Sequence, residues 1–311
     1  MSDSLSGRIA ISKTQRTKMI AVLSAPSNLG LSPSLSGGEP GVREAPEALL
    51  KQPLLEVLCA TDAGVVVPPP YDPAIDHNIG VRNAASLRSY TIELAERINC
   101  LLEQSYFPIV LGGDCSILLG SALALRRLGR YGLLFIDGHT DLLTPATSQT
   151  GGAAGMDLAM VTGTGPSELT SIDGLGPYLH HEDVVVCGFR WPAIEATSPA
   201  QPKAPMLSLP LASLRDQELA TVIDRAINHF ADQEFWVHVD ADVLAPEWMP
   251  AVDSPDPGGM TPMELMAILK ASLAMEHCVG LELTIYDPTL DHGSKGASLL
   301  VSVLKEAMTG A

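Results

Sequence analysis

Short runs of apolar and β-branched residues alternate with longer amphipathic segments along most of the chain. Such short runs are typical of strands that are buried on both faces of a parallel sheet. We expect strands at Met19–Ser24, Phe107–Leu111, Leu133–Asp137, Val184–Phe189, Phe235–Asp240 and Val279–Thr284. The longer segments have apolar residues at helical spacing. They predict helices at Leu87–Ser105, Ser116–Leu128, Leu211–Asp232, Pro262–Ala274 and Ala297–Met308. This alternation predicts an α/β fold with a wound parallel sheet.

The predicted strands and helices form one continuous series, and no change in composition marks a second domain. We expect an N-terminal tail at residues 1–18 and a single domain at residues 19–308. Two segments, Ser27–Pro46 and Thr144–Gly155, are rich in Gly, Ser and Pro. Both follow predicted strands, and loops beyond the carboxyl ends of parallel strands usually build the functional site. We therefore interpret them as active-site loops and not as interdomain linkers.

Two acidic clusters each come directly after a predicted strand. The first runs from Asp137 to Asp141 and the second from His238 to Asp242. Side chains two positions apart in an extended chain share a face, so the ligand-type groups of each cluster can converge. These groups are Asp137, His139, Asp141, Asp240 and Asp242.

Crowded carboxylates at a sheet edge repel one another and resist ionisation unless cations neutralise them. Two divalent cations would do so, and ions about 3.5–4 Å apart can hold a water and lower its pKa until it attacks as hydroxide. An Asp after a strand is also often only a turn former or a helix N-cap. Two clusters of the same design, with Asp114 and Cys115 after a third strand, favour a metal-dependent hydrolase.

Composition limits the partners of the chain. The formal net charge of −17 argues against nucleic acid and against an anionic membrane surface. The five cysteines are an odd, widely spaced set without a C-x-x-C pair, which suits reduced thiols in the cytosol. The sequence shows no secretory signal and no run of the roughly 20 apolar residues that a membrane helix needs. We expect a cytoplasmic protein that acts on a small molecule.

The motifs resemble those of the ureohydrolase family, which includes arginase and agmatinase. That family has a Gly-Gly-Asp-His-Ser, an Asp-Ala-His-x-Asp and a Ser-x-Asp-x-Asp motif in this order. The matching segments here are Gly112–Ser116, Asp137–Asp141 and His238–Asp242. Gly41–Leu49 is similar to an early segment of the family, and Gly280–Leu283 resembles the strand that supplies its guanidinium-binding glutamate. The combination is more specific than any one motif.

The resemblance implies a three-layer sandwich around an eight-stranded parallel sheet and a binuclear centre, usually of manganese. The implied ligands are Asp137 and Asp240 as bridges, Cys115 and Asp141 on one ion, and His139 and Asp242 on the other. Asp141 would also orient the attacking hydroxide, and Glu282 would pair with the cationic guanidino substrate, from which urea leaves. Relatives commonly form homo-oligomers, either trimers or hexamers.

The sequence departs from the family pattern at the metal and substrate positions. Cys115 replaces a histidine, and a thiolate favours zinc, iron or nickel over manganese; alternatively, Cys115 is only a small buried residue. Ala154, in Gly152–Gly155, replaces the proton-shuttling histidine of arginases, and Trp191–Ala193 lacks the acidic group that they offer to the α-amino group. Plain L-arginine is therefore a poor candidate, whereas a modified arginine is conceivable.

Three further side chains have open roles. His238 replaces the serine of the third motif, and it could be a catalytic acid or base, a donor behind the metal ligands, or a hydrogen-bonded structural residue. Asp157 and Asp253 are either substrate contacts or solvated turn carboxylates.

The leading functional hypothesis is a metal-dependent hydrolase of a linear C–N bond in a guanidino or amidino compound. A second hypothesis is a non-catalytic relative that keeps one structural metal. A third is a cysteine hydrolase with Cys115 as nucleophile and His139 as base. Neighbouring carboxylates disfavour the third, because they raise the pKa of a thiol.

Overall fold

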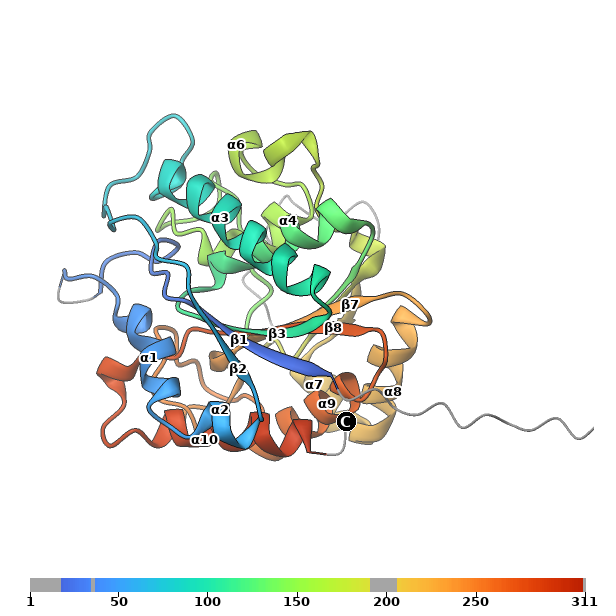
Figure 1. Ribbon diagram of the computed structural model, residues 1–311. Coiled ribbons are helices and arrows are strands. Elements are labelled where there is room, and N and C mark those ends of the chain that lie inside the picture. Colours follow the sequence, from blue (N-terminus) through green and yellow to red (C-terminus); the bar gives the residue numbers. More distant parts are fainter. Residues whose placement is uncertain (1–17, 35–36, 191–205, 310–311) are drawn as a thin grey trace, which may run out of the picture.

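The structure is a computed structural model that describes residues 18–34, 37–190 and 206–309. Its centre is one eight-stranded sheet with the order β2-β1-β3-β8-β7-β4-β5-β6 (Figure 1). Every pair of neighbouring strands is parallel. The strands are β1 (Met19–Ala25), β2 (Thr61–Val65), β3 (Tyr106–Gly112), β4 (Gly132–Ile136), β5 (Val184–Cys187), β6 (Leu207–Leu209), β7 (Phe235–Asp240) and β8 (Cys278–Thr284). The α/β prediction and the implied eight strands are confirmed.

Helices cover both faces of the sheet. They are α1 (Ala45–Leu50), α2 (Leu54–Val57), α3 (Ala84–Glu103), α4 (Leu118–Leu128), α5 (Asp157–Val161), α6 (Ser167–Thr170), α7 (Leu211–Asp216), α8 (Leu219–Phe230), α9 (Pro262–Leu273) and α10 (Lys295–Met308). In Figure 1, α3, α4 and α6 lie on one side of the sheet, and α1, α2 and α7 to α10 lie on the other. Alternate strand residues serve the two apolar cores, as Val22 and Leu23 of β1 do. The three layers are therefore confirmed.

All six strands predicted from the sequence are present, with bounds shifted by two residues or fewer at each end. The two strands without a prediction, β2 and β6, form the edges of the sheet. β2 is mostly exposed and β6 has three residues, so neither is a buried apolar run. The helix predicted at Leu211–Asp232 is two helices, because the backbone is extended at Gln217 and Glu218.

Three parts of the sequence predictions lie outside the described residues: residues 1–17 of the N-terminal tail, residues 35–36 of the Ser27–Pro46 loop, and Trp191–Ala193. Among the described residues, no helix combines the length and the apolar character that crossing a membrane requires. All five cysteines are free thiols.

The two Gly-rich loops meet beside the carboxyl ends of the central strands. The backbone amide of Ala154 donates to Gly30 O (3.1 Å), and the Ser27 hydroxyl donates to Asp114 Oδ2 (2.6 Å). Gly113 allows this approach, because a Cβ there would lie 1.8 Å from the Ser27 carbonyl oxygen. The loops thus form one wall around the end of β3.

Candidate metal centre

The two acidic clusters lie side by side because their strands are neighbours. β4 and β7 pair in register as far as Ile136 and Val239, so Asp137 and Asp240 are the next residues on adjacent strands. On the other side of β7, Asp240 pairs with Thr284 of β8. Cys115 reaches the same place from the turn after β3: its Sγ donates to Asp240 Oδ2 (2.8 Å) and lies 3.0 Å from Thr284 Oγ1. The sheet therefore brings the two acidic clusters and Cys115 together at one place.

The leading aspartate of each cluster also forms a turn. Asp137 Oδ1 accepts the backbone amide of His139 (2.6 Å), and Asp240 Oδ1 accepts the amide of Asp242 (2.7 Å) as the N-cap of a short 3-10 turn. Each has a second oxygen that the turn does not use, and Asp137 Oδ2 is buried without a hydrogen-bond partner among the described residues. The turn-forming and ligand interpretations are therefore compatible, since each uses a different oxygen.

We call Asp137, His139 and Asp242 the outer cluster, because it opens toward solvent. One ligand atom from each lies within 4.8 Å of the others. His139 Nδ1 lies 2.9 Å from Asp242 Oδ2 and 3.7 Å from Asp137 Oδ1, and its Nε2 lies 3.1 Å from Asp256 Oδ2. The His139 side chain is 33% exposed, whereas Asp137 is fully buried. His139 is thus the side chain through which this cluster meets the surface.

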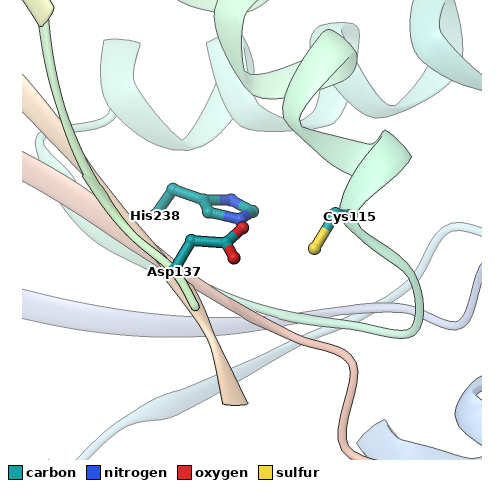
Figure 2. Close-up of side chains that lie close together, drawn as sticks. All are labelled: Cys115, Asp137 and His238. Carbon is teal, nitrogen blue, oxygen red and sulfur yellow. The ribbon is translucent and has the colours of Figure 1, made fainter. Parts of the chain in front are cut away.

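A second group of donors lies deeper in the protein. We call it the inner cluster: Cys115, Asp141, Asp157, His238 and Asp240, with Asp137 between the two clusters. Cys115, Asp137 and His238 each offer one atom within 4.8 Å of the others, and so do Cys115, Asp141 and Asp157. Figure 2 shows Cys115, Asp137 and His238 pointing toward a common space. All members except Asp141 are buried.

Burial and mutual repulsion set the protonation of these groups in the metal-free protein. Burial, followed by the charges of neighbouring carboxylates, raises the pKa of Asp137, Asp141 and Asp240 well above the usual range. Burial and then Asp240 raise the pKa of the Cys115 thiol in the same way. Burial alone would lower the pKa of His139, but its hydrogen bond to Asp242 and the acidic neighbours raise it to about 10. A bound cation would relieve this crowding.

Neither lysine nor arginine neutralises the two clusters within the described part of the chain. The ion pairs of Asp137 and Asp242 are all with His139. Arg190 approaches from outside, but its Nη2 donates to the backbone oxygen of Asp242 (2.6 Å) and not to the carboxylate. The carboxylates therefore remain available for cations.

His238 and Glu282 form a buried pair behind the inner cluster. His238 Nδ1 lies 2.7 Å from Glu282 Oε1, and both side chains are 0% exposed. The other oxygen, Glu282 Oε2, accepts a short hydrogen bond from Ser121 of α4. The His238 ring stacks on Phe135, with centroids 4.7 Å apart and an interplanar angle of 5°. The sequence indicated neither Ser121 nor this pairing.

The remaining candidates differ in exposure. Asp157, at the start of α5, is fully buried, with Oδ1 accepting the Leu158 amide (2.5 Å) and Oδ2 without a partner among the described residues. It is therefore not a solvated turn carboxylate. Asp253 is exposed. Ala154 is 7% exposed, and its methyl group offers no proton donor to the site.

Comparisons with known proteins cover almost the whole chain. A family model described as Arginase family matches residues 18–310. The arginase of Bacillus subtilis (strain 168) is 27% identical over 298 residues, which are 94% of this chain and 98% of that protein. The structure of Bacillus caldovelox arginase has a TM-score of 0.86 at 24% identity, covering 95% and 99% of the two chains. Formimidoylglutamase from Bacillus subtilis shares the fold, with a TM-score of 0.74 at 20% identity over 97% and 89%. Because the family match extends over nearly every residue and includes all three motifs, this chain belongs to the arginase family.

Proposed function

We propose that the protein uses two divalent cations to hydrolyse a linear C–N bond in a guanidino or amidino compound, releasing urea or a related amide. The observation that carries the proposal is the position of Asp137, whose ligand atoms belong to both the outer and the inner cluster. Two cation sites near enough to share a carboxylate would suit the closely spaced ion pair that two-metal hydrolysis uses. Family membership agrees with a hydrolase.

The residues present fit such ions. Among the donor atoms of the two clusters, three are buried without a hydrogen-bond partner in the described residues: Asp137 Oδ2, Asp157 Oδ2 and His238 Nε2. Buried polar atoms without partners are rare and point to a missing ion or water. We assign His139 and Asp242 to the outer ion, Cys115 and Asp141 to the inner ion, and Asp137 and Asp240 to both. Because of the Cys115 thiol, zinc, iron and nickel are candidates for the bound ions beside the manganese that the family favours.

Two divalent cations, when bound here, would make a water nucleophilic near neutral pH. Asp141 lies beside this water in our proposal, where its carboxylate would orient the water by a hydrogen bond and accept its proton. The Asp141 backbone has φ +49°, a left-handed conformation that Asp tolerates better than most residues. Asp141 and His139 are the partly exposed members of the two clusters, so we place substrate entry on their side.

The substrate in our proposal is a guanidino or amidino compound other than plain L-arginine. Ala154 offers no proton shuttle, so a less basic group, such as that of a modified arginine, would suit this site better. The exposed carboxylate of Asp253 is a candidate contact for a substrate cation, whereas buried Asp157 could reach only a group that enters the inner cluster. Both oxygens of Glu282 already accept hydrogen bonds from protein side chains. The pairing of Glu282 with the substrate stays a prediction.

A non-catalytic role with one structural ion is the second candidate. The observation that favours it is the burial of the inner cluster, where Cys115 and His238 are both 0% exposed. An ion held only there would be out of reach of most substrates. The number of bound ions separates this candidate from the first.

The test is a substrate panel on protein whose metal content has been measured. The full chain is loaded with manganese, zinc, iron or nickel and assayed with arginine, hydroxyarginine, agmatine, guanidinobutyrate and formiminoglutamate. We expect two ions per chain and product from a compound other than arginine, with none from the chelator-treated control. Two bound ions without product from any compound would refute the hydrolase, and one chelator-resistant ion without turnover would support the structural role.

A further inference from the structure

We infer that His238 binds the inner ion through Nε2, and that Glu282 and Ser121 hold its ring in the orientation this requires. The inference rests on the proposed metal centre but is independent of whether that centre hydrolyses anything. It assigns to His238 the imidazole ligand that the inner site lacks at position 115.

The sheet places these side chains together. In the register of β7 with its two neighbours, His238 pairs with Phe135 of β4 and with Glu282 of β8. Partners in parallel register point to the same face, so the imidazole lies between an aromatic ring and a carboxylate. This face is the one covered by α4, from which Ser121 completes the group. The ring is therefore fixed on three sides.

The hydrogen bonds determine which ring nitrogen is free. A carboxylate only accepts hydrogen bonds, and Glu282 accepts one from the Ser121 hydroxyl and one from His238 Nδ1. The proton of His238 therefore lies on Nδ1, and Nε2 presents a lone pair. A carboxylate behind the Nδ1–H of a histidine is the usual support of a metal-binding imidazole.

The free nitrogen points at the other inner ligands. His238 Nε2 is buried and has no hydrogen-bond partner among the described residues. Ligand atoms of Cys115, Asp137 and His238 all lie within 4.8 Å of one another. Figure 2 shows the imidazole above the Asp137 carboxylate, with the Cys115 sulfur turned toward both. An ion between these three groups would satisfy the nitrogen and the free Asp137 oxygen together.

The resulting donor set predicts which metal binds. A thiolate, an imidazole and a carboxylate form a mixed S, N, O set that suits zinc or cobalt better than manganese. The outer cluster has two carboxylates and one imidazole, which is a harder set. The two positions are therefore chemically different, and we expect zinc to fill the inner one first.

The test uses X-ray absorption at the zinc edge on full-length protein with one zinc ion per chain. His139, the other imidazole of the two clusters, is removed by His139→Ala, so that His238 is the imidazole left at the centre. We expect the zinc spectrum of this variant to show one sulfur and one imidazole ligand. Sulfur without imidazole, or no bound zinc, would overturn the inference.

Loss of the side chain gives a second measurement. In cobalt-loaded protein, His238→Ala should weaken the inner site and change the thiolate-to-cobalt absorption band, which Cys115→Ser should abolish. The matched control is His229→Ala, because His229 bonds the backbone oxygen of Glu182 away from the centre. Circular dichroism checks the fold of each variant. An unchanged band in a folded His238→Ala protein would also overturn the inference.

The outcomes separate this inference from the proposed function. An inner ion with an imidazole ligand but no turnover would leave the inference intact and refute the hydrolase. Turnover with an inner ion that has no imidazole ligand would do the reverse.

Discussion

The outer and inner clusters share Asp137 but differ in burial and in chemistry. The outer cluster keeps the ligands that its motifs imply and reaches the surface through His139, which is 33% exposed. The inner cluster has a cysteine in place of the implied histidine, and Cys115 and His238 are both 0% exposed. The outer cluster is thus partly exposed and offers harder ligand atoms, whereas the inner cluster is buried and offers softer ones.

This difference indicates how a ligand can be replaced without losing a site. His238 lies on the strand next to Asp137, with Glu282 behind it. The substitution at position 115 need not have emptied the inner site, because an imidazole from β7 points into the same space. The following predictions test the relation between the two clusters, beginning with the largest effect.

Removing the shared carboxylate should disable both clusters. Asp137→Asn keeps an oxygen that can accept the His139 amide, so the turn survives, but it removes the charge that the cations need. We expect loss of at least one ion and a fall in kcat/KM of roughly 1000-fold or more, since bound metal contributes several kcal/mol to the transition state. Metal analysis and steady-state kinetics measure this.

Asp232→Asn is the matched control. Asp232 is an exposed aspartate in the turn before β7, whereas the site lies after the other end of that strand. It should retain both ions and activity. An Asp137→Asn protein that still binds two ions with unchanged kinetics would contradict the idea of a shared ligand.

Removing the negative charge of Glu282, which lies beside His238, should weaken metal binding at the inner cluster and leave the outer cluster unchanged. In Glu282→Gln the amide can orient either its oxygen or its nitrogen toward His238 Nδ1, so the tautomer is no longer fixed. We expect the affinity of the inner site for zinc to fall about 10–100-fold, the usual effect of losing such a partner. Competition with a chromogenic chelator measures the affinity.

The outer site serves as the internal control for Glu282→Gln. If both sites weaken equally, the loss is structural and the proposed support of His238 is wrong. If neither changes while KM rises, the result favours the predicted pairing of Glu282 with substrate instead.

How far the sequence predicts this molecule depends on whether a feature is local or created by the sheet. The strands β1, β3, β4, β5, β7 and β8 are buried apolar runs that a sequence reveals, whereas the edge strands β2 and β6 are not. Within the segment Asp137–Asp141, the two-residue spacing of Asp137 and His139 already predicts that their side chains converge. The pairing of His238 with Glu282 requires β7 and β8 to be neighbours in a particular register, and no local pattern gives that.

The same distinction explains two side chains whose environment the sequence did not reveal. Asp157 follows a Gly-rich loop, and a solvated turn carboxylate is one of the two interpretations open to it, but in the folded protein it is fully buried. Ser121 lies in α4 among apolar residues, and its role follows only from the helix lying over β8. Contacts between elements that are distant in sequence decide both cases.

The stability of the metal-free protein should fall as pH rises. Buried Asp137 and Asp240 have raised pKa values, so the folded state keeps protons that the unfolded chain has lost above about pH 4. Their stabilising effect is complete below that pH and is lost as pH rises toward the raised values. The raised pKa of His139 also lowers the stability as pH rises, between pH 6.5 and about pH 10. Each group contributes at most about 1.4 kcal/mol per pH unit.

Bound metal should remove this trend, because the ligands are then ionised and metal affinity rises with pH. Thermal midpoints of metal-free and zinc-loaded protein between pH 5 and 9, at constant ionic strength, test both statements. A metal-free protein that became more stable over this range would show that the carboxylates are already neutralised by groups of the protein itself.

The smallest expected effect separates the metal centre from a cysteine nucleophile. Cys115 is fully buried, and burial followed by the charge of Asp240 raises the pKa of its thiol, whereas Cys59 and Cys100 are exposed. Iodoacetamide should therefore modify Cys59 and Cys100 in the metal-loaded protein, as peptide mass spectrometry would show, while activity stays unchanged. If Cys115 were instead the most rapidly alkylated thiol and activity fell in step, the inner cluster would be an open nucleophile site, and its contrast with the outer cluster would fail.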